Sequence, residues 1–153
     1  MSEQPIQLRQ LRQHAVRLLA RREHTRAELV RKLAALGTPE EIDTVLNELA
    51  RSGLQSDARF AESYLRSQAA RLGATRLRQT LRQKGVSPDL IADHVAKLSN
   101  ELPDELERAR AVWQKKFSAA PADRSDWARQ ARFLQGRGFS VEIIRKLLKE
   151  IEE

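Results

Sequence analysis

The sequence predicts an all-α protein built as an elongated tandem array of three three-helix repeats. Composition is the first reason: the chain contains 20 Ala and 21 Leu but only 7 Val and 6 Ile. Ala and Leu are strong helix formers, whereas β-branched residues favour strands, so a sheet is not expected. The second reason is an internal repeat, and the third is the regular placement of Gly and Pro.

Three glycines mark the repeat. A leucine lies four residues before each of them, and an isoleucine or leucine lies five residues after. Because three triplets agree without a gap, we interpret them as a tandem array; the alternative is ordinary helix-end chemistry in any all-α protein. The triplets are Leu33, Gly37 and Ile42; Leu81, Gly85 and Leu90; Leu134, Gly138 and Ile143.

The first repeat is predicted over residues 8–54, after a flexible N-terminus at 1–7. Thr25 and Glu28 form a capping box at the start of a helix. Thr38 is a candidate N-cap followed by Pro39 in the first turn. Gly37 and Gly53 follow apolar helical patterns, as left-handed residues that end helices do. The predicted helices are 8–22, 25–36 and 39–52.

The second repeat is predicted over residues 55–101. Gly73 and Gly85 are assigned the same helix-ending role, and Ser87 with Pro88 begins the last helix. The predicted helices are 57–72, 74–84 and 88–99.

The third repeat is predicted over residues 102–153. Pro103 and Asp104 begin it, and Gly138 ends its second helix. The predicted helices are 104–119, 124–137 and 140–152. Helices this short are not stable alone, so each must bury its apolar side against its neighbours.

Charge follows the repeat. The chain has a net charge of +7, and the balance over 1–36, 37–57, 58–86, 87–107, 108–149 and 150–153 is +5, −4, +6, −5, +8 and −3. If the repeats stack in similar orientation, their basic helices form one stripe that suits a polyanion or an acidic protein surface. Helix dipoles, which favour acidic first turns and basic last turns, are a local alternative.

The sequence contains little that suggests catalysis. It has no Cys, which excludes a disulfide framework, a thiolate zinc site and a cysteine nucleophile. His14, His24 and His94 are far apart and lack ligand partners at metal-site spacing. No nucleotide-binding or hydrolase motif is present. We therefore expect no enzyme activity, no cofactor and no metal.

Membrane and secretion signals are also lacking. No apolar run is long enough to span a membrane, and the first 15 residues lack a signal-peptide core. We expect a soluble cytoplasmic monomer. Five of the seven aromatic residues lie in the last repeat, where core packing is the usual role and a stacking platform for unpaired bases is the alternative.

Two stretches resemble the RecX family. The central one is Leu54–Ser67 (LQSDARFAESYLRS) followed by Arg76–Val86 (RLRQTLRQKGV). The upstream one is Leu18–Thr25 (LLARREHT) with Glu28, Leu29, Lys32 and Leu33. The resemblance covers nearly the whole chain and is looser in the last repeat. Gln68 stands where an Arg is expected, and the turn at Arg71–Ala74 is slightly shorter than the family's Gly-rich turn.

This resemblance implies a protein of tandem three-helix repeats that modulates the recombinase RecA. Such a protein enters the groove of the RecA–DNA filament, limits its growth or promotes its disassembly, and lowers recombinase, ATPase and co-protease activity. Its context is DNA repair, DNA recombination and the SOS response, with RecA and single- or double-stranded DNA as partners.

The family signature also implies roles for particular residues. Four are structural, namely Phe60, Tyr64, Leu81 and Gly85. Four are contact candidates, namely Arg59, Arg66, Arg76 and Lys84; an ion pair with Asp57 is the structural alternative for Arg59. Charge alone adds Arg71, Arg78 and Arg82 to the contact candidates.

A free-standing helical nucleic-acid-binding protein, such as a transcription regulator with a helix-turn-helix, is the alternative function. It requires a recognition helix with base-reading side chains in a symmetric dimer. A purely protein-binding helical scaffold is a third possibility, and it predicts binding that hardly depends on salt.

Overall fold

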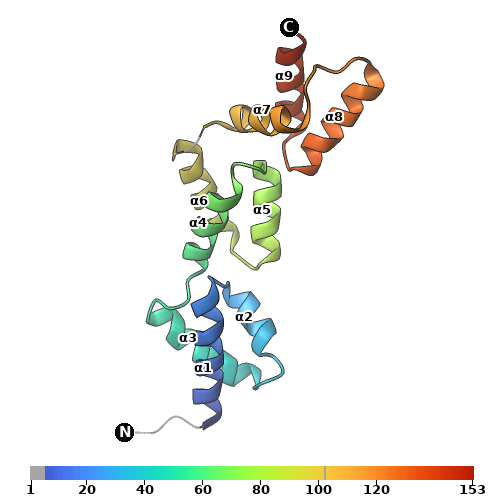
Figure 1. Ribbon diagram of the computed structural model, residues 1–153. Coiled ribbons are helices and arrows are strands. Elements are labelled where there is room, and N and C mark those ends of the chain that lie inside the picture. Colours follow the sequence, from blue (N-terminus) through green and yellow to red (C-terminus); the bar gives the residue numbers. More distant parts are fainter. Residues whose placement is uncertain (1–5, 102) are drawn as a thin grey trace.

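The computed structural model describes residues 6–101 and 103–153, and nine helices form all of the regular structure in that part of the chain. Figure 1 shows three helical units in a row, with the chain ends at opposite ends of the molecule. The predicted all-α tandem array is therefore confirmed. The flexible N-terminus expected at 1–7 falls mostly outside the described residues, and the exact repeat boundaries stay a prediction because residue 102 is also outside them.

Each repeat is built from three consecutive helices. The first contains α1 (Ile6–Arg21), α2 (Arg26–Leu33) and α3 (Pro39–Arg51); the second contains α4 (Asp57–Gln68), α5 (Ala74–Gln83) and α6 (Pro88–Glu101); the third contains α7 (Glu105–Lys116), α8 (Arg124–Gly136) and α9 (Val141–Glu152). In every repeat the first and third helices pack against each other, with the second helix beside them.

The three repeats have three separate cores. Leu29, Leu33 and Leu46 are fully buried in the first, and Leu77 and Leu81 occupy the second. The third is built around Leu134, Phe139, Leu147 and their neighbours. Each of these cores is composed of residues from its own repeat alone, as expected for a solenoid-like array.

Side chains cap the start of most helices, and Thr25, Thr38, Ser87 and Asp104 do so at predicted positions. The hydroxyls of Thr25 and Thr38 each accept a hydrogen bond from the N–H three residues on. In turn, the carboxylates of Glu28 and Glu41 accept the N–H of the N-cap residue. Asp104, Asp123 and Ser140 cap the helices of the third repeat in the simpler one-way form.

Two of the five glycines assigned to left-handed helix ends do not have a left-handed backbone. Gly53, Gly85 and Gly138 have φ values of +80°, +89° and +93°, but Gly37 and Gly73 do not have positive φ. Gly73, with φ of −82°, is the N-cap of α5, since α4 has already ended at Gln68. The second helix of the first repeat likewise ends at Leu33, three residues before the predicted end.

Leu81→Ala should lower the free energy of unfolding of the second repeat by about 2–5 kcal/mol, because it opens a cavity around a fully buried side chain. Urea denaturation and hydrogen exchange measure the loss and its place in the chain. Leu54→Ala is the matched control, since Leu54 is 44% exposed and should cost under about 0.5 kcal/mol. Equal losses for the two variants would contradict the assigned core.

Candidate interaction surface

Arg59, the first predicted contact residue, joins the first repeat to the second. Its Nε donates to Glu23 Oε1 at 2.6 Å, and its Nη1 and Nη2 donate to the carbonyls of Gly53 and Leu54 at 2.8 and 3.1 Å. A structural ion pair is therefore present, although its partner is Glu23 and not the expected Asp57. The carboxylate of Asp57 instead accepts the backbone N–H of Arg26 at 2.8 Å.

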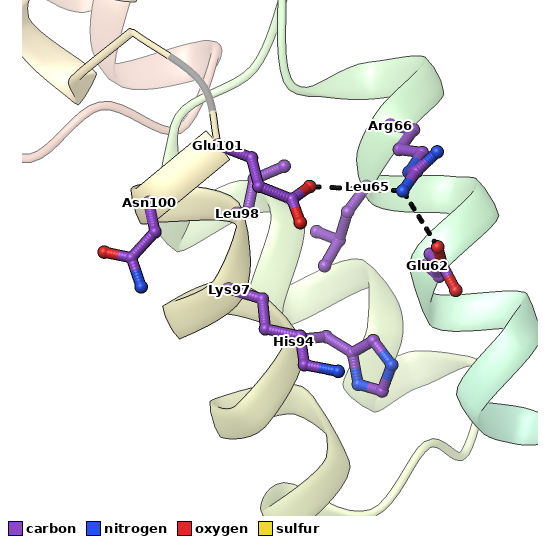
Figure 2. Close-up of a pocket in the computed structure, with 8 residues that line it drawn as sticks. All are labelled: Glu62, Leu65, Arg66, His94, Lys97, Leu98, Asn100 and Glu101. Carbon is purple, nitrogen blue, oxygen red and sulfur yellow. Dashed lines mark ion pairs between the residues drawn. The ribbon is translucent and has the colours of Figure 1, made fainter.

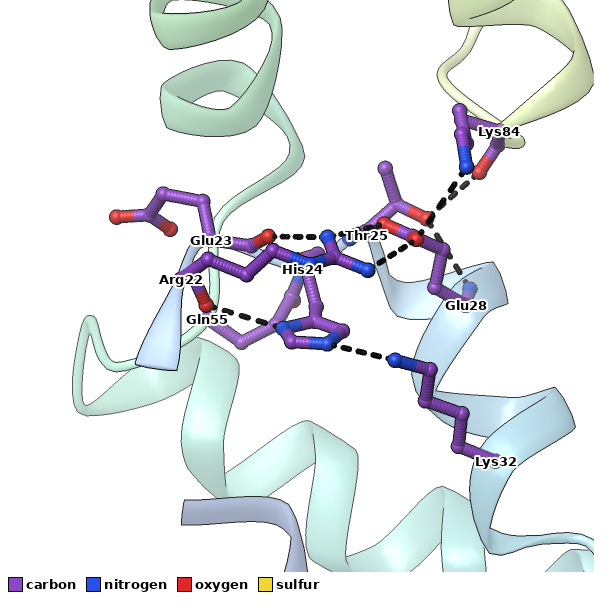
Figure 3. A network of polar contacts seen from close by, with 8 residues as sticks. All are labelled: Arg22, Glu23, His24, Thr25, Glu28, Lys32, Gln55 and Lys84. Carbon is purple, nitrogen blue, oxygen red and sulfur yellow. Dashed lines mark hydrogen bonds and ion pairs between the residues drawn. The ribbon is translucent and has the colours of Figure 1, made fainter. Parts of the chain in front are cut away.

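Lys84 also lies between the first and second repeats, where the α5–α6 turn meets the start of α2 (Figure 3). We call these contacts between the first and second repeats the first junction. Lys84 O accepts a hydrogen bond from Thr25 Oγ1 at 2.6 Å, and Lys84 Nζ lies 3.6 Å from Glu28 Oε2. Glu28 also pairs with Arg22 at 3.0 Å. The capping box predicted as a helix boundary is thus also an inter-repeat contact.

The electrostatics of the first junction keep Glu28 ionised. Burial alone would raise the pKa of Glu28, but hydrogen bonds from Arg22 and from the Thr25 N–H, with the charges of Arg22 and Lys84, lower it to about 2.

His24 lies beside this carboxylate, in surroundings that favour its neutral form. Burial, followed by the charges of Arg22 and Lys32, lowers its pKa against the opposing hydrogen bond to Arg22 O. Lys32 Nζ lies 3.1 Å from His24 Nε2, which as an unprotonated ring nitrogen can accept a hydrogen bond from the ammonium.

Arg76 belongs to the second junction, between the second and third repeats. Its Nη1 donates to Gly136 O at 3.0 Å, at the end of α8. The backbone N–H groups of Gly73 and Thr75 donate to Arg137 O and Gly138 O at 2.8 and 3.2 Å. Arg76 therefore holds two repeats together.

One contact recurs at both junctions. The first N–H of α2, from Arg26, donates to Asp57, and the first N–H of α5, from Ala74, donates to Glu105 Oε1 at 3.1 Å. Both acceptors are the first residue of the next repeat's leading helix. A carboxylate at a helix N-terminus satisfies an unpaired N–H and interacts favourably with the helix dipole.

Gly85 and Gly138, the left-handed glycines after the second helices of repeats two and three, each lie in close contact with the preceding repeat. A Cβ on Gly85 would overlap the Cβ of Ala27 in α2, and a Cβ on Gly138 would overlap the Cβ of Arg76 in α5. Only glycine combines a left-handed backbone with this approach.

Arg66 lies within the second repeat, on the face that α4 turns toward α6. Figure 2 shows its guanidinium between two carboxylates, Glu62 at 3.0 Å and Glu101 at 4.0 Å. It borders a hollow of about 260 Å³ that His94 and Lys97 also line from α6. These exposed ion pairs partly neutralise Arg66 and add little stability.

Arg78 and Arg82 differ from the other contact candidates. Within the part of the chain that the structure describes, neither forms a hydrogen bond or an ion pair, and both are exposed. They lie one turn apart on α5, whereas Arg76 and Arg82 point about 120° apart around the helix axis. Arg66, Arg76 and Arg82 therefore do not form one cluster. Arg71 donates to the neutral Gln68 at 3.2 Å and faces the third repeat.

The residues expected to be structural are placed as follows. Phe60 and Leu81 are buried in the second core, and Tyr64 is half-buried and stacks on Phe60 with ring centroids 6.4 Å apart. In the third repeat Trp113 and Phe117 are buried, and the Trp113 indole N–H donates to Gln130 at 2.7 Å. These two rings pack in the core and do not form an exposed stacking platform.

Neither a metal-binding cluster nor a transmembrane helix is found in the described ranges. No three His, Asp or Glu side chains come together there in a way that could hold a metal ion. None of the helices at 6–101 and 103–153 has the length and apolar character needed to cross a membrane.

Comparison with known proteins gives one consistent result. Models of the first, second and third three-helix domains of RecX match residues 12–49, 56–94 and 103–148. The regulatory protein RecX of Leptothrix cholodnii is 44% identical over 140 residues, covering 91% of this chain and 87% of the relative. RecX of Chromobacterium violaceum is 46% identical over 139 residues, covering 90% and 88%.

Solved structures give the same fold. The crystal structure of RecX from Lactobacillus salivarius superposes with a TM-score of 0.78 at 22% identity, covering 95% of this chain and 97% of the other. A second crystal structure of a regulatory protein RecX has a TM-score of 0.80 at 25% identity, covering 94% and 73%.

Gly85→Ala should destabilise the first junction more than Gly53→Ala destabilises its turn. Both changes force a left-handed alanine, which costs about 1–2 kcal/mol, but a Cβ at Gly53 meets nothing within 4 Å. The extra loss at Gly85 measures the approach to Ala27. Urea denaturation gives the free energies, and small-angle scattering reports the spacing of the repeats. Identical effects would show that the close approach carries no energy.

The stability that Glu28 contributes should depend on pH in a defined window. Because its folded-state pKa of about 2 lies below the ordinary value of 4.5, the contribution is complete above about pH 4.5 and is lost as the pH falls toward 2. Glu28→Gln should therefore cost about 2–3 kcal/mol at pH 7 and flatten the acid limb of a urea-denaturation series.

Glu62→Gln is the matched control, since it removes an exposed pair worth under about 1 kcal/mol. If Glu28→Gln left the acid limb as steep as in the parent chain, the first junction would not depend on this carboxylate.

Proposed function

The chain belongs to the RecX family of regulatory proteins, and we propose that it binds the RecA nucleoprotein filament and lowers recombinase, ATPase and co-protease activity. It does so by limiting filament growth or promoting disassembly. We also propose that it binds DNA, and that it works as a cytoplasmic monomer in DNA repair, DNA recombination and the SOS response.

One observation carries this proposal: the chain is a row of three small units, and the same carboxylate-to-helix hydrogen bond recurs at each junction. A row of similar units suits a polymer that repeats its own surface, because each unit meets an equivalent place on successive subunits. Linked contacts raise the effective concentration of one another, so weak individual contacts give tight binding.

The distribution of charge supports a polyanionic filament as the partner. The arginines that hold the junctions, such as Arg59 and Arg76, already have intramolecular partners. Arg78 and Arg82 are exposed and unpaired among the described residues, so their charge is available to phosphate or to acidic protein surface. Interference with filament assembly requires binding alone and no catalytic group.

The direct test is the ATPase activity of RecA on single-stranded DNA, with this protein added below the RecA concentration. A lower steady-state rate at substoichiometric ratios is expected, together with loss of strand exchange. No effect at any ratio would refute the proposal. Sequence-selective binding to duplex DNA without any effect on RecA would favour the transcription regulator instead.

Arg82→Gln should weaken inhibition of RecA and make its salt dependence shallower, by about one unit in log K against log salt if the guanidinium contacts a phosphate. Arg51→Gln is the matched control, because both arginines are exposed in the last turn of a helix and Arg51 lies in an acidic block. An unchanged slope for Arg82→Gln would remove Arg82 from the phosphate contacts.

A further inference from the structure

The second junction contains a basic hollow that the sequence pattern did not single out. It has a volume of about 200 Å³ and lies between the end of α4 and the outer face of α7. Four cations line it: Arg71 follows α4, Lys115 and Lys116 end α7, and Arg137 follows α8. None of the described residues that line it is acidic. We call this hollow the basic groove.

Three of the four cations of the basic groove are held in place without being neutralised. The Lys116 ammonium and the Arg137 guanidinium lie 5.6 and 5.1 Å from the centroid of the Phe133 ring. A ring quadrupole attracts cations but carries no net charge. Arg71 donates only to the neutral amide of Gln68, at 3.2 Å. All four cations therefore keep their full charge for a ligand.

Comparison of the two junctions shows that positive charge without a neighbouring carboxylate is found at the second junction and not at the first. Glu28 lies three residues after the N-cap of α2, and Arg76 lies three residues after the N-cap of α5. Lys84 precedes Gly85 as Arg137 precedes Gly138. The first junction thus brings a carboxylate to the lysine, at 3.6 Å, whereas the second supplies two arginines at the matching places.

The basic groove continues along α7 into a more apolar hollow of about 290 Å³. Ala70 lines both hollows, and Arg108 and Ala111 border the second on the same face of α7 as Lys115. Arg108 is 8% exposed; its Nη1 donates to Pro103 O at 3.2 Å, and its Nε has no partner among the described groups. Glu107 is the acidic residue at this second hollow.

From this geometry we infer that the basic groove binds the phosphodiester backbone of single-stranded DNA. The inference deepens the proposed function and rests on it, since it names where the DNA strand of a filament would meet this chain. Concave grooves that combine several cations with apolar surface are typical of proteins that bind a single strand, because phosphates meet the cations while sugars and bases lie on the apolar wall. Ala70, Val112 and Phe133 supply that wall.

A single strand fits this site better than a duplex. The basic groove is recessed between two repeats, whereas reading a duplex in its major groove requires a protruding helix or ribbon. No such element is needed to bind a flexible strand through its phosphates.

The first experiment measures binding of labelled oligothymidylate to the full chain by fluorescence anisotropy, without RecA and over a range of salt concentrations. Arg71→Gln with Lys115→Gln should lower the affinity about tenfold and reduce the salt slope by about 1.4 units, since each lost contact to a single strand is worth about 0.7. Arg145→Gln with Lys149→Gln is the matched control: it removes the same charge from exposed positions on α9 in the third repeat and should have little effect.

The second experiment locates the strand. Because the chain has no Cys, a single Ala111→Cys places one thiol at the apolar hollow that continues the basic groove, and Ala96→Cys places one on the exposed surface of α6. Oligothymidylate should slow maleimide labelling of the Ala111→Cys variant several-fold and leave the Ala96→Cys variant unchanged. Equal protection of both, or of neither, would overturn the inference.

Parallel RecA assays separate this inference from the proposed function. If Arg71→Gln with Lys115→Gln binds oligothymidylate normally but no longer inhibits RecA, the basic groove contacts acidic protein surface and the inference is overturned. The inference also fails if the parent chain inhibits RecA without binding the oligonucleotide. If oligothymidylate binding depends on the basic groove but the parent chain has no effect on RecA, the inference stands and the proposed function fails.

Discussion

The carboxylate that opens one repeat and caps a helix of the repeat before it is the contact on which the array depends. Asp57 accepts the first N–H of α2, and Glu105 accepts the first N–H of α5. Each second helix is short and would otherwise leave that donor unpaired at the junction. At both junctions the repeats are therefore linked by a backbone N–H and a carboxylate, and this contact is kept while the other side chains of the junctions differ.

Around this shared contact the two junctions have diverged in charge. The first brings Glu28 between Arg22 and Lys84 and is internally neutralised, whereas the second places Arg76 and Arg137 at the corresponding sites. The arginines of the chain consequently divide into those with partners inside the protein, some of which hold repeats together, and those whose charge remains available. Net charge or a count of basic residues does not distinguish the two sets; the partners of each guanidinium do.

The helices, their order and the threefold repeat are predictable from the sequence, because these follow from local patterns and capping residues such as Thr25 and Thr38. The ion pair of Arg59 with Glu23 is not, since its members lie 36 residues apart and only the docking of two repeats brings them together. The N-capping role of Gly73 cannot be predicted from the sequence either, because it depends on the residue at which α4 ends.

The candidate site is less predictable than the fold for the same reason. Charge alone points to Arg71 but not to Lys115, Lys116 and Arg137, because these belong to another repeat and reach the same hollow only through the second junction. One signal in the sequence could have pointed to Arg137: it precedes Gly138 as Lys84 precedes Gly85 in the repeat before. The separate cores have a further consequence for shape: because no apolar core is shared between repeats, a change of tilt at a junction does not have to open any of them. The angle between neighbouring repeats can therefore change while each repeat keeps its own packed interior.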